Sequence, residues 1–154
     1  MNPPLLGIDI DDTLALWTDD PAVLPAPAPD SADILRAWLD AGLVRIVYIT
    51  SRKRIRREET SQWLAWHQYP APQHVLYEED IPLGKPEALL ALGAFGLVDD
   101  MPRTLEAACA AGLRAYWRDI PKNNHMPPPV PHKNLHPWHD WSTLDTLVRD
   151  HLHV

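Results

Sequence analysis

Aspartates stand directly after two short apolar runs that lie far apart in the chain. Residues 5–8 lead into Asp-Ile-Asp-Asp at 9–12, and residues 95–98 lead into Asp-Asp at 99–100. Short apolar runs of this kind indicate buried β-strands. The carboxyl ends of parallel strands meet at one edge of a sheet, where ligands bind in open α/β folds. We therefore expect the two acidic groups to share one crevice.

The rest of the chain alternates β-like apolar runs with helical patterns, which indicates an α/β fold. Further strands at residues 44–49, 75–77 and 114–117 predict a Rossmann-like, three-layer α/β/α arrangement with a central parallel sheet of about five strands. Helices are expected between Ser31 and Gly42, from about Lys53 to His67, from Pro86 to about Leu92, between Pro102 and Gly112, and after Ser142. Ser31 is expected to cap the first of these helices, and Ser142 to open a capping box with Asp145 for the last.

The length of 154 residues allows one domain with one continuous core. Within a single domain over residues 1–154 we expect two proline-rich segments, a loop at about 14–30 and a Pro- and His-rich tail at about 120–140, with residues 120–138 irregular. No apolar run is long enough to predict a membrane span or a signal peptide. The single Cys109 forms no internal disulfide, which fits a reducing, cytoplasmic location.

Crowded carboxylates repel one another, so a hard cation is the natural compensation at the predicted crevice. A set of ligands made only of oxygen suits Mg²⁺, which also binds substrate phosphate oxygens. The strand at residues 44–49 leads into Thr50 and Ser51, whose hydroxyls reach the same edge of the sheet. Lys85 follows Gly84 at the start of a helix, where an ammonium group can contact a phosphate and offset the acids.

Together these pieces resemble the haloacid dehalogenase (HAD) superfamily of phosphotransferases. The four motifs of that superfamily occur here in its order, and the resemblance covers residues 4–118: Asp9-x-Asp11-x-Thr13, the strand ending in Thr50, Lys85, and Asp99-Asp100. The resemblance implies a Mg²⁺-dependent phosphomonoester hydrolase that works through an aspartyl-phosphate. Asp9 is then the nucleophile, and Asp11 is the general acid for the leaving alcohol and later the base for the attacking water.

The resemblance also implies which groups hold the metal and the phosphate. The Asp9 carboxylate, the backbone carbonyl of Asp11 and Asp99 would bind Mg²⁺, with Asp100 as a ligand through water. Thr50 and Lys85 would hold the phosphoryl oxygens. Ser51 takes the place of Thr50 if the strand ends one residue later than expected.

Members of this superfamily select substrates mainly through inserted cap domains. Here residues 14–31 form a proline-rich loop too short for a folded cap, and residues 50–85 hold only a core helix and strand. The chain is therefore similar to capless members with open sites. Such sites suit nucleic-acid ends or proteins, or small substrates held by loops.

Two local likenesses point to nucleotide phosphates. Arg52 with the tryptophan-rich helix that follows is similar to the 3′-phosphatase domain of polynucleotide kinases. The tail, with Pro121-x-Asn123 and Trp138, is similar to the 5′(3′)-deoxyribonucleotidases. We therefore expect nucleotides, or single-stranded nucleic-acid ends with 3′ or 5′ phosphates, as substrates. The alternatives are another small metabolite, a phosphoprotein, or a non-catalytic domain that binds a partner through its proline-rich tail.

The chain is acidic, with a net charge of −7, but it has one basic run at residues 52–57. The net charge argues against broad wrapping of duplex nucleic acid. The run is either a solvated helix start balanced by Glu58 and Glu59, or a site for a substrate with more than one phosphate. Trp17 either stacks on a base or packs against the prolines of its own loop. The candidate substrate contacts are Thr13, Trp17, Ser51, Arg52 and Arg54.

Overall fold

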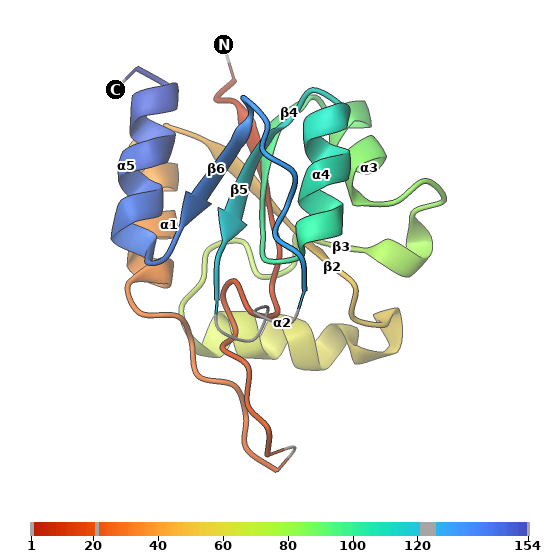
Figure 1. The fold of residues 1–154 in the computed structure, drawn as a ribbon. Helices are drawn as coiled ribbons and strands as arrows, with labels where there is room; N and C mark the ends of the chain where they lie inside the picture. Colours follow the sequence, from red (N-terminus) through yellow and green to blue (C-terminus); the bar gives the residue numbers. More distant parts are fainter. Residues whose placement is uncertain (1, 21, 121–125, 154) are drawn as a thin grey trace.

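A parallel sheet forms the centre of the molecule (Figure 1). The computed structural model describes residues 2–20, 22–120 and 126–153. Its six strands are β1 (Leu5–Ile8), β2 (Arg45–Thr50), β3 (Val75–Tyr77), β4 (Ala94–Asp99), β5 (Arg114–Arg118) and β6 (Leu135–Trp138). They lie in the order β3-β2-β1-β4-β5-β6, and every neighbouring pair is parallel. The expected α/β class is confirmed, with one more strand than the five predicted.

Helices cover both faces of the sheet, as the three-layer prediction requires (Figure 1). They are α1 (Ser31–Asp40), α2 (Arg57–Trp66), α3 (Lys85–Ala91), α4 (Pro102–Ala110) and α5 (Trp141–His151), with short 3₁₀ helices η1 (Arg54–Arg56) and η2 (Glu78–Asp80). Side chains of α1, α2 and α5 share one buried apolar cluster, and those of α3 and α4 share the other. None of the described helices is both long and apolar enough to cross a membrane.

Tryptophans fill the α1 and α5 side of the core. Trp38, Trp138 and Trp141 are almost fully buried, and the Trp141 ring contacts both of the others. The indole nitrogen of Trp38 donates to Asp145 at 2.6 Å, and that of Trp141 donates to the backbone carbonyl of Thr13 at 3.2 Å. Because that carbonyl belongs to the loop after β1, helix α5 fixes the backbone that carries the first aspartates.

The tail contains a strand that the sequence did not predict. Residues 135–138 form β6 at the edge of the sheet, inside the segment expected to be irregular. Pro137 hid it, because a proline donates no hydrogen bond and is normally excluded from the middle of a sheet, although an edge strand tolerates it. The Pro121-x-Asn123 element lies outside the described residues.

Both predicted helix caps are wrong by one or two residues. Asp30 precedes α1 with a positive φ of 68°, and the Ser31 hydroxyl turns inward to contact Ala28 and Tyr69, each at 2.7 Å. At α5 the cap is Asp140, whose carboxylate accepts from the backbone nitrogen of Thr143 at 2.8 Å. An aspartate stands one residue before Ser31 and two residues before Ser142, and the Asp140 side chain caps α5, whereas the Asp30 side chain makes no cap hydrogen bond.

Two histidines pack against each other between β6 and α5. The rings of His136 and His151 are 4.3 Å apart, and the Tyr116 hydroxyl lies 2.8 Å from His151 Nδ1. His136 Nε2 is buried and has no hydrogen-bond partner among the described residues. Burial, together with the charges of His151 and Arg114, lowers the pKa of His136 to about 4.

His136 is expected to make the stability of the chain depend on pH. Unfolded histidine has a pKa near 6.5, so between pH 6.5 and 4 the unfolded chain binds more protons than the folded chain. The free energy of unfolding therefore decreases as the pH falls through this window, by about 1 kcal/mol at pH 5 after allowance for partial exposure. Urea denaturation at pH 7.5 and 5.0 measures it. His136→Phe keeps a ring and should remove most of the difference in the free energy of unfolding between the two pH values. If the difference is undiminished, other groups cause it.

Candidate active site

The acidic groups predicted to share a crevice come together at the carboxyl ends of adjacent strands. Asp9 directly follows β1, and Asp99 is the last residue of β4. Strands β1 and β4 pair up to Ile8 and Val98, and the backbone nitrogen of Asp9 donates to the Val98 carbonyl at 2.9 Å. The sheet register thus places the two aspartates side by side.

A buried lysine joins these two carboxylates. Lys85 is the first residue of α3 and follows Gly84, whose positive φ of 89° favours glycine. The Lys85 ammonium nitrogen lies 3.0 Å from Asp9 Oδ1 and 2.9 Å from Asp99 Oδ2. All three side chains are buried, so the ion pairs are poorly screened by water.

The electrostatics of the site reflect more negative than positive charge. Burial, and then the charge of Asp99, raise the pKa of Asp9 well above its usual range, although Lys85 acts in the opposite direction. Burial and Asp99 likewise raise the pKa of Asp100 to about 7. Burial would lower the pKa of Lys85, but Asp9 and Asp99 outweigh it and raise that pKa overall. A bound cation would offset the repulsion among these carboxylates.

Three of the carboxylates have the geometry of a metal site. Asp9, Asp99 and Asp100 each offer one oxygen, and these oxygens lie within 4.8 Å of one another. In the part of the chain that the structure describes, no other group of three or more His, Cys, Asp or Glu residues does so. The second oxygen of Asp99 is fixed by the backbone nitrogens of Asp100 and Met101, at 2.7 and 3.0 Å. Oxygen ligands alone, already partly oriented, fit Mg²⁺.

The hydroxyl residues divide between buried and exposed positions. Thr13 is fully buried, and its hydroxyl donates to Asp9 Oδ2 at 3.3 Å, so it lies behind the carboxylate. Thr50 ends β2 and is also fully buried, and its hydroxyl accepts from the backbone nitrogen of Arg52 at 3.1 Å. Ser51 is exposed. Thr50, and not Ser51, is therefore the last residue of the strand, which is the first of the two alternatives that the sequence left open.

Arg52 turns inward and holds Asp11. Its Nε and Nη2 atoms lie 2.9 and 2.7 Å from the two carboxylate oxygens of Asp11, and its Nη1 donates to Thr60 at 3.2 Å. Arg52 is buried, whereas the Asp11 side chain is 47% exposed. This forked pair fixes the orientation of Asp11 at the mouth of the site. The sequence marked Arg52 as a substrate contact and gave no sign of this pairing.

Arg118 is a second arginine near the site, and unlike Arg52 it was not singled out by the sequence. It is the last residue of β5, and its Nη1 donates to the backbone carbonyl of Asp12 at 2.5 Å. Asp12 itself has a positive φ of 64°, which a non-glycine residue adopts only where its surroundings hold it. The arginine therefore stabilises the turn that carries Asp9 and Asp11. Its position after an apolar strand was the only available signal.

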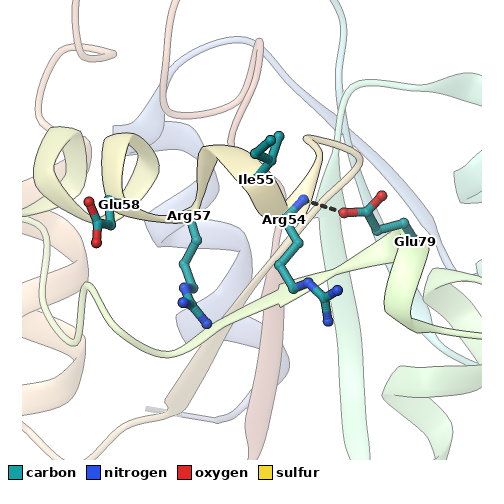
Figure 2. Close-up of a pocket in the computed structure, with 5 residues that line it drawn as sticks. All are labelled: Arg54, Ile55, Arg57, Glu58 and Glu79. Atoms are coloured by element: carbon teal, nitrogen blue, oxygen red, sulfur yellow. Dashed lines mark hydrogen bonds between the residues drawn. The ribbon is translucent and has the colours of Figure 1, made fainter.

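Two other arginines of the basic run pair with local acids. Arg54 lies 3.4 Å from Asp80, and Arg56 lies 3.1 Å from Glu59. Figure 2 shows Arg54 and Arg57 extending to the same side of the helix, into a cavity of about 640 Å³ that Glu58 and Glu79 also line. With acids among its lining residues, this cavity has mixed charge. Trp17 is 60% exposed.

Comparison with known proteins places the chain among folds of this type. The family model of the LNS2 domain of PITM 1-3 matches residues 7–88, more than half of the chain. Two solved structures have the same fold. The D,D-heptose 1,7-bisphosphate phosphatase from B. bronchiseptica, in complex with magnesium and phosphate, is 15% identical with a TM-score of 0.67, over 96% of this chain and 99% of that one. The corresponding enzyme from Burkholderia thailandensis is 17% identical with a TM-score of 0.64, over 98% and 99%.

These likenesses confirm the predicted haloacid dehalogenase type of fold. At identities of 15% and 17%, the solved structures show a likeness of fold. No curated protein matches the chain. The matched range of the family model contains the residues of the first three motifs, from Asp9 to Lys85.

Proposed function

We propose that this chain, which belongs to the LNS2 domain family, is a Mg²⁺-dependent phosphomonoesterase of the haloacid dehalogenase type. One observation carries the proposal: two buried aspartates share a buried lysine at adjacent strand ends, while a third aspartate stands at the mouth of the site. A purely structural role would not need an excess of buried carboxylates, which destabilises the fold unless a ligand offsets it.

Asp9, Asp99 and Asp100 are the residues that would hold Mg²⁺. When bound, the ion neutralises charge on the transferring phosphoryl group. The crystal structure of the B. bronchiseptica phosphatase contains magnesium and phosphate, which supports this assignment for a chain of the same fold.

In the proposed mechanism, a carboxylate oxygen of Asp9 attacks phosphorus, and the bond from phosphorus to the leaving oxygen breaks. Asp11 gives its proton to that oxygen, so the alcohol leaves neutral. Water then attacks the phosphorus of the aspartyl-phosphate and loses a proton to Asp11. The bond from phosphorus to Asp9 breaks, inorganic phosphate is released, and the Asp9 carboxylate is restored. Arg52 aims the Asp11 carboxylate for both transfers.

Lys85 and Thr50 complete the site. The Lys85 ammonium group, held between Asp9 and Asp99, would contact a phosphoryl oxygen and would also fix the nucleophile. Thr50 lies at the end of β2, the strand next to β1, and its hydroxyl would contact the same phosphoryl group. The hydroxyl of Thr13 fixes the second oxygen of Asp9 from behind.

Nucleotides, or nucleic-acid ends with 3′ or 5′ phosphates, are the substrates we propose. The support is the openness of the site: in the described residues 14–20 and 22–30 there is only a loop, and residues 51–84 hold η1, α2, β3 and η2. Without a cap, a large alcohol portion of the substrate can extend out of the site. The second candidate is a sugar bisphosphate, because both solved structures of this fold are phosphatases of D,D-heptose 1,7-bisphosphate.

A substrate panel tests the proposal. It contains 4-nitrophenyl phosphate, 3′- and 5′-nucleotides, 3′-phosphorylated oligonucleotides and sugar phosphates, each with Mg²⁺ and with a chelator. We expect phosphate release that depends on Mg²⁺ and is fastest, by kcat/KM, with a nucleotide or an oligonucleotide. A wide margin in favour of sugar phosphates would replace the nucleotide proposal with the second candidate. No release from any compound would refute the phosphatase.

A further inference from the structure

A groove about 560 Å³ in volume runs between the proline-rich loop and α2, beside the site. Leu24, Pro25 and Pro27 form one wall, and Trp63, Trp66 and His67 form the other. In Figure 1 the loop, in red and orange, crosses α2, in yellow. The volume lies in the range of small-molecule pockets, and the walls are mainly apolar and aromatic, as such pockets usually are.

A hydrogen bond joins the two walls of the groove, and a second one orders the loop. The Trp63 indole nitrogen donates to the Pro25 carbonyl at 3.0 Å, which ties the loop to α2. The Trp63 ring packs on His67 at 4.7 Å. Within the loop, the backbone nitrogen of Leu16 donates to the Ala26 carbonyl at 2.8 Å. The groove is therefore a built feature of the fold.

Large apolar side chains at the groove are left exposed. Trp66 is 82% exposed and Leu24 is 75% exposed, although both line it. An aromatic ring presented to solvent beside a fixed apolar wall is suited to pack against another flat group.

The charged side chains of the groove already have partners. Arg52 pairs with Asp11 and Arg56 with Glu59, at 2.7 and 3.1 Å. An occupant therefore needs no charge of its own to match these walls. Together with the mainly apolar and aromatic walls, this favours an uncharged, flat aromatic group.

Arg52 connects the groove to the chemistry. The same guanidinium that lines the groove holds Asp11, the proposed acid for the leaving oxygen. Because Asp11 must contact that oxygen, the part of the substrate attached to it lies close to Arg52. We infer that the groove binds the leaving group and takes a flat, uncharged aromatic portion, the base when the substrate is a nucleotide. This inference rests on the proposed function.

Kinetics with and without the aromatic portion test the inference. Adenosine 5′-monophosphate and ribose 5-phosphate carry the same phosphate ester and differ in the base. We expect a lower KM for the nucleotide, and Trp66→Ala should raise that KM by about tenfold, as loss of one stacking contact does. The KM for ribose 5-phosphate should not change. Trp66→Phe should retain most of the preference, and Leu92→Ala, an exposed apolar residue after α3, should retain all of it.

Binding without turnover separates this inference from the proposed function. Adenosine, which has no phosphate, is titrated into the chain while the indole N–H signals of the tryptophans are followed by NMR. We expect a shift of the Trp66 signal. If adenosine shifts Trp66 but no phosphate ester is hydrolysed, the groove stands and the phosphatase fails. A shift at Trp17 in place of Trp66, or equal effects of Trp66→Ala on both KM values, overturns the inference.

Discussion

Asp9→Asn should abolish phosphate release while the chain stays folded. An amide cannot replace a carboxylate as the attacking group, so we expect kcat for 4-nitrophenyl phosphate to fall by about 10³-fold or more. The hydrogen bonds of Thr13 and Lys85 fix this carboxylate between two strand ends, and no other described aspartate makes both contacts. Release of phosphate and circular dichroism, measured on the same preparation, check activity and fold together.

The matched control is Asp40→Asn, which makes the same change at an exposed position at the end of α1. It should leave phosphate release unchanged. Stability gives a second readout, because burial and the charge of Asp99 disfavour the ionised form of Asp9 and raise its pKa. Without Mg²⁺ we therefore expect Asp9→Asn to be no less stable than the parent, and the rise in Tm with Mg²⁺ to shrink. Equal rates for parent and Asp9→Asn would show that Asp9 is not the nucleophile.

The sequence predicted the core of this fold because its central strands are signalled twice. In β1 and β4, a short apolar run is followed at once by aspartates, so both the strand and its end are marked. The edge strand β6 has neither signal, because it is short, half-exposed and interrupted by Pro137. Its pairing with β5 and the packing of Trp138 hold it in place, and these are tertiary contacts that local pattern does not encode.

The candidate site was predictable in its members but not in its internal contacts. Motif spacing brought Asp9, Lys85 and Asp99 to one place, since strand order and helix starts fix their backbones. Which arginine of the basic run turns inward was hidden, because Arg52 and its neighbours look alike in sequence. The difference arises from position: Arg52 follows the buried Thr50 by two residues, so its side chain faces the interior and finds Asp11 and Thr60.

Lys85→Met should damage both stability and activity. Among the described residues, Lys85 is the one cation that bonds both Asp9 and Asp99. Removal of one partner from a buried ion pair leaves uncompensated charge, which typically lowers the free energy of unfolding by about 3–5 kcal/mol. We also expect kcat/KM to fall by about 10²-fold or more, because the phosphoryl group loses a positive contact. Urea denaturation and phosphate release measure the two effects.

Mg²⁺ and a second substitution distinguish charge compensation from simple loss of packing. If repulsion among carboxylates causes the instability, saturating Mg²⁺ should restore part of the lost stability. A cation that binds only the folded chain stabilises that state. Addition of Asp99→Asn to Lys85→Met should restore stability in the absence of Mg²⁺, yet not activity. Lys133→Met, at an exposed position before β6, should change neither quantity. If neither Mg²⁺ nor Asp99→Asn recovers any stability, Lys85 acts mainly by filling space, and the balance of charge proposed for this site is wrong.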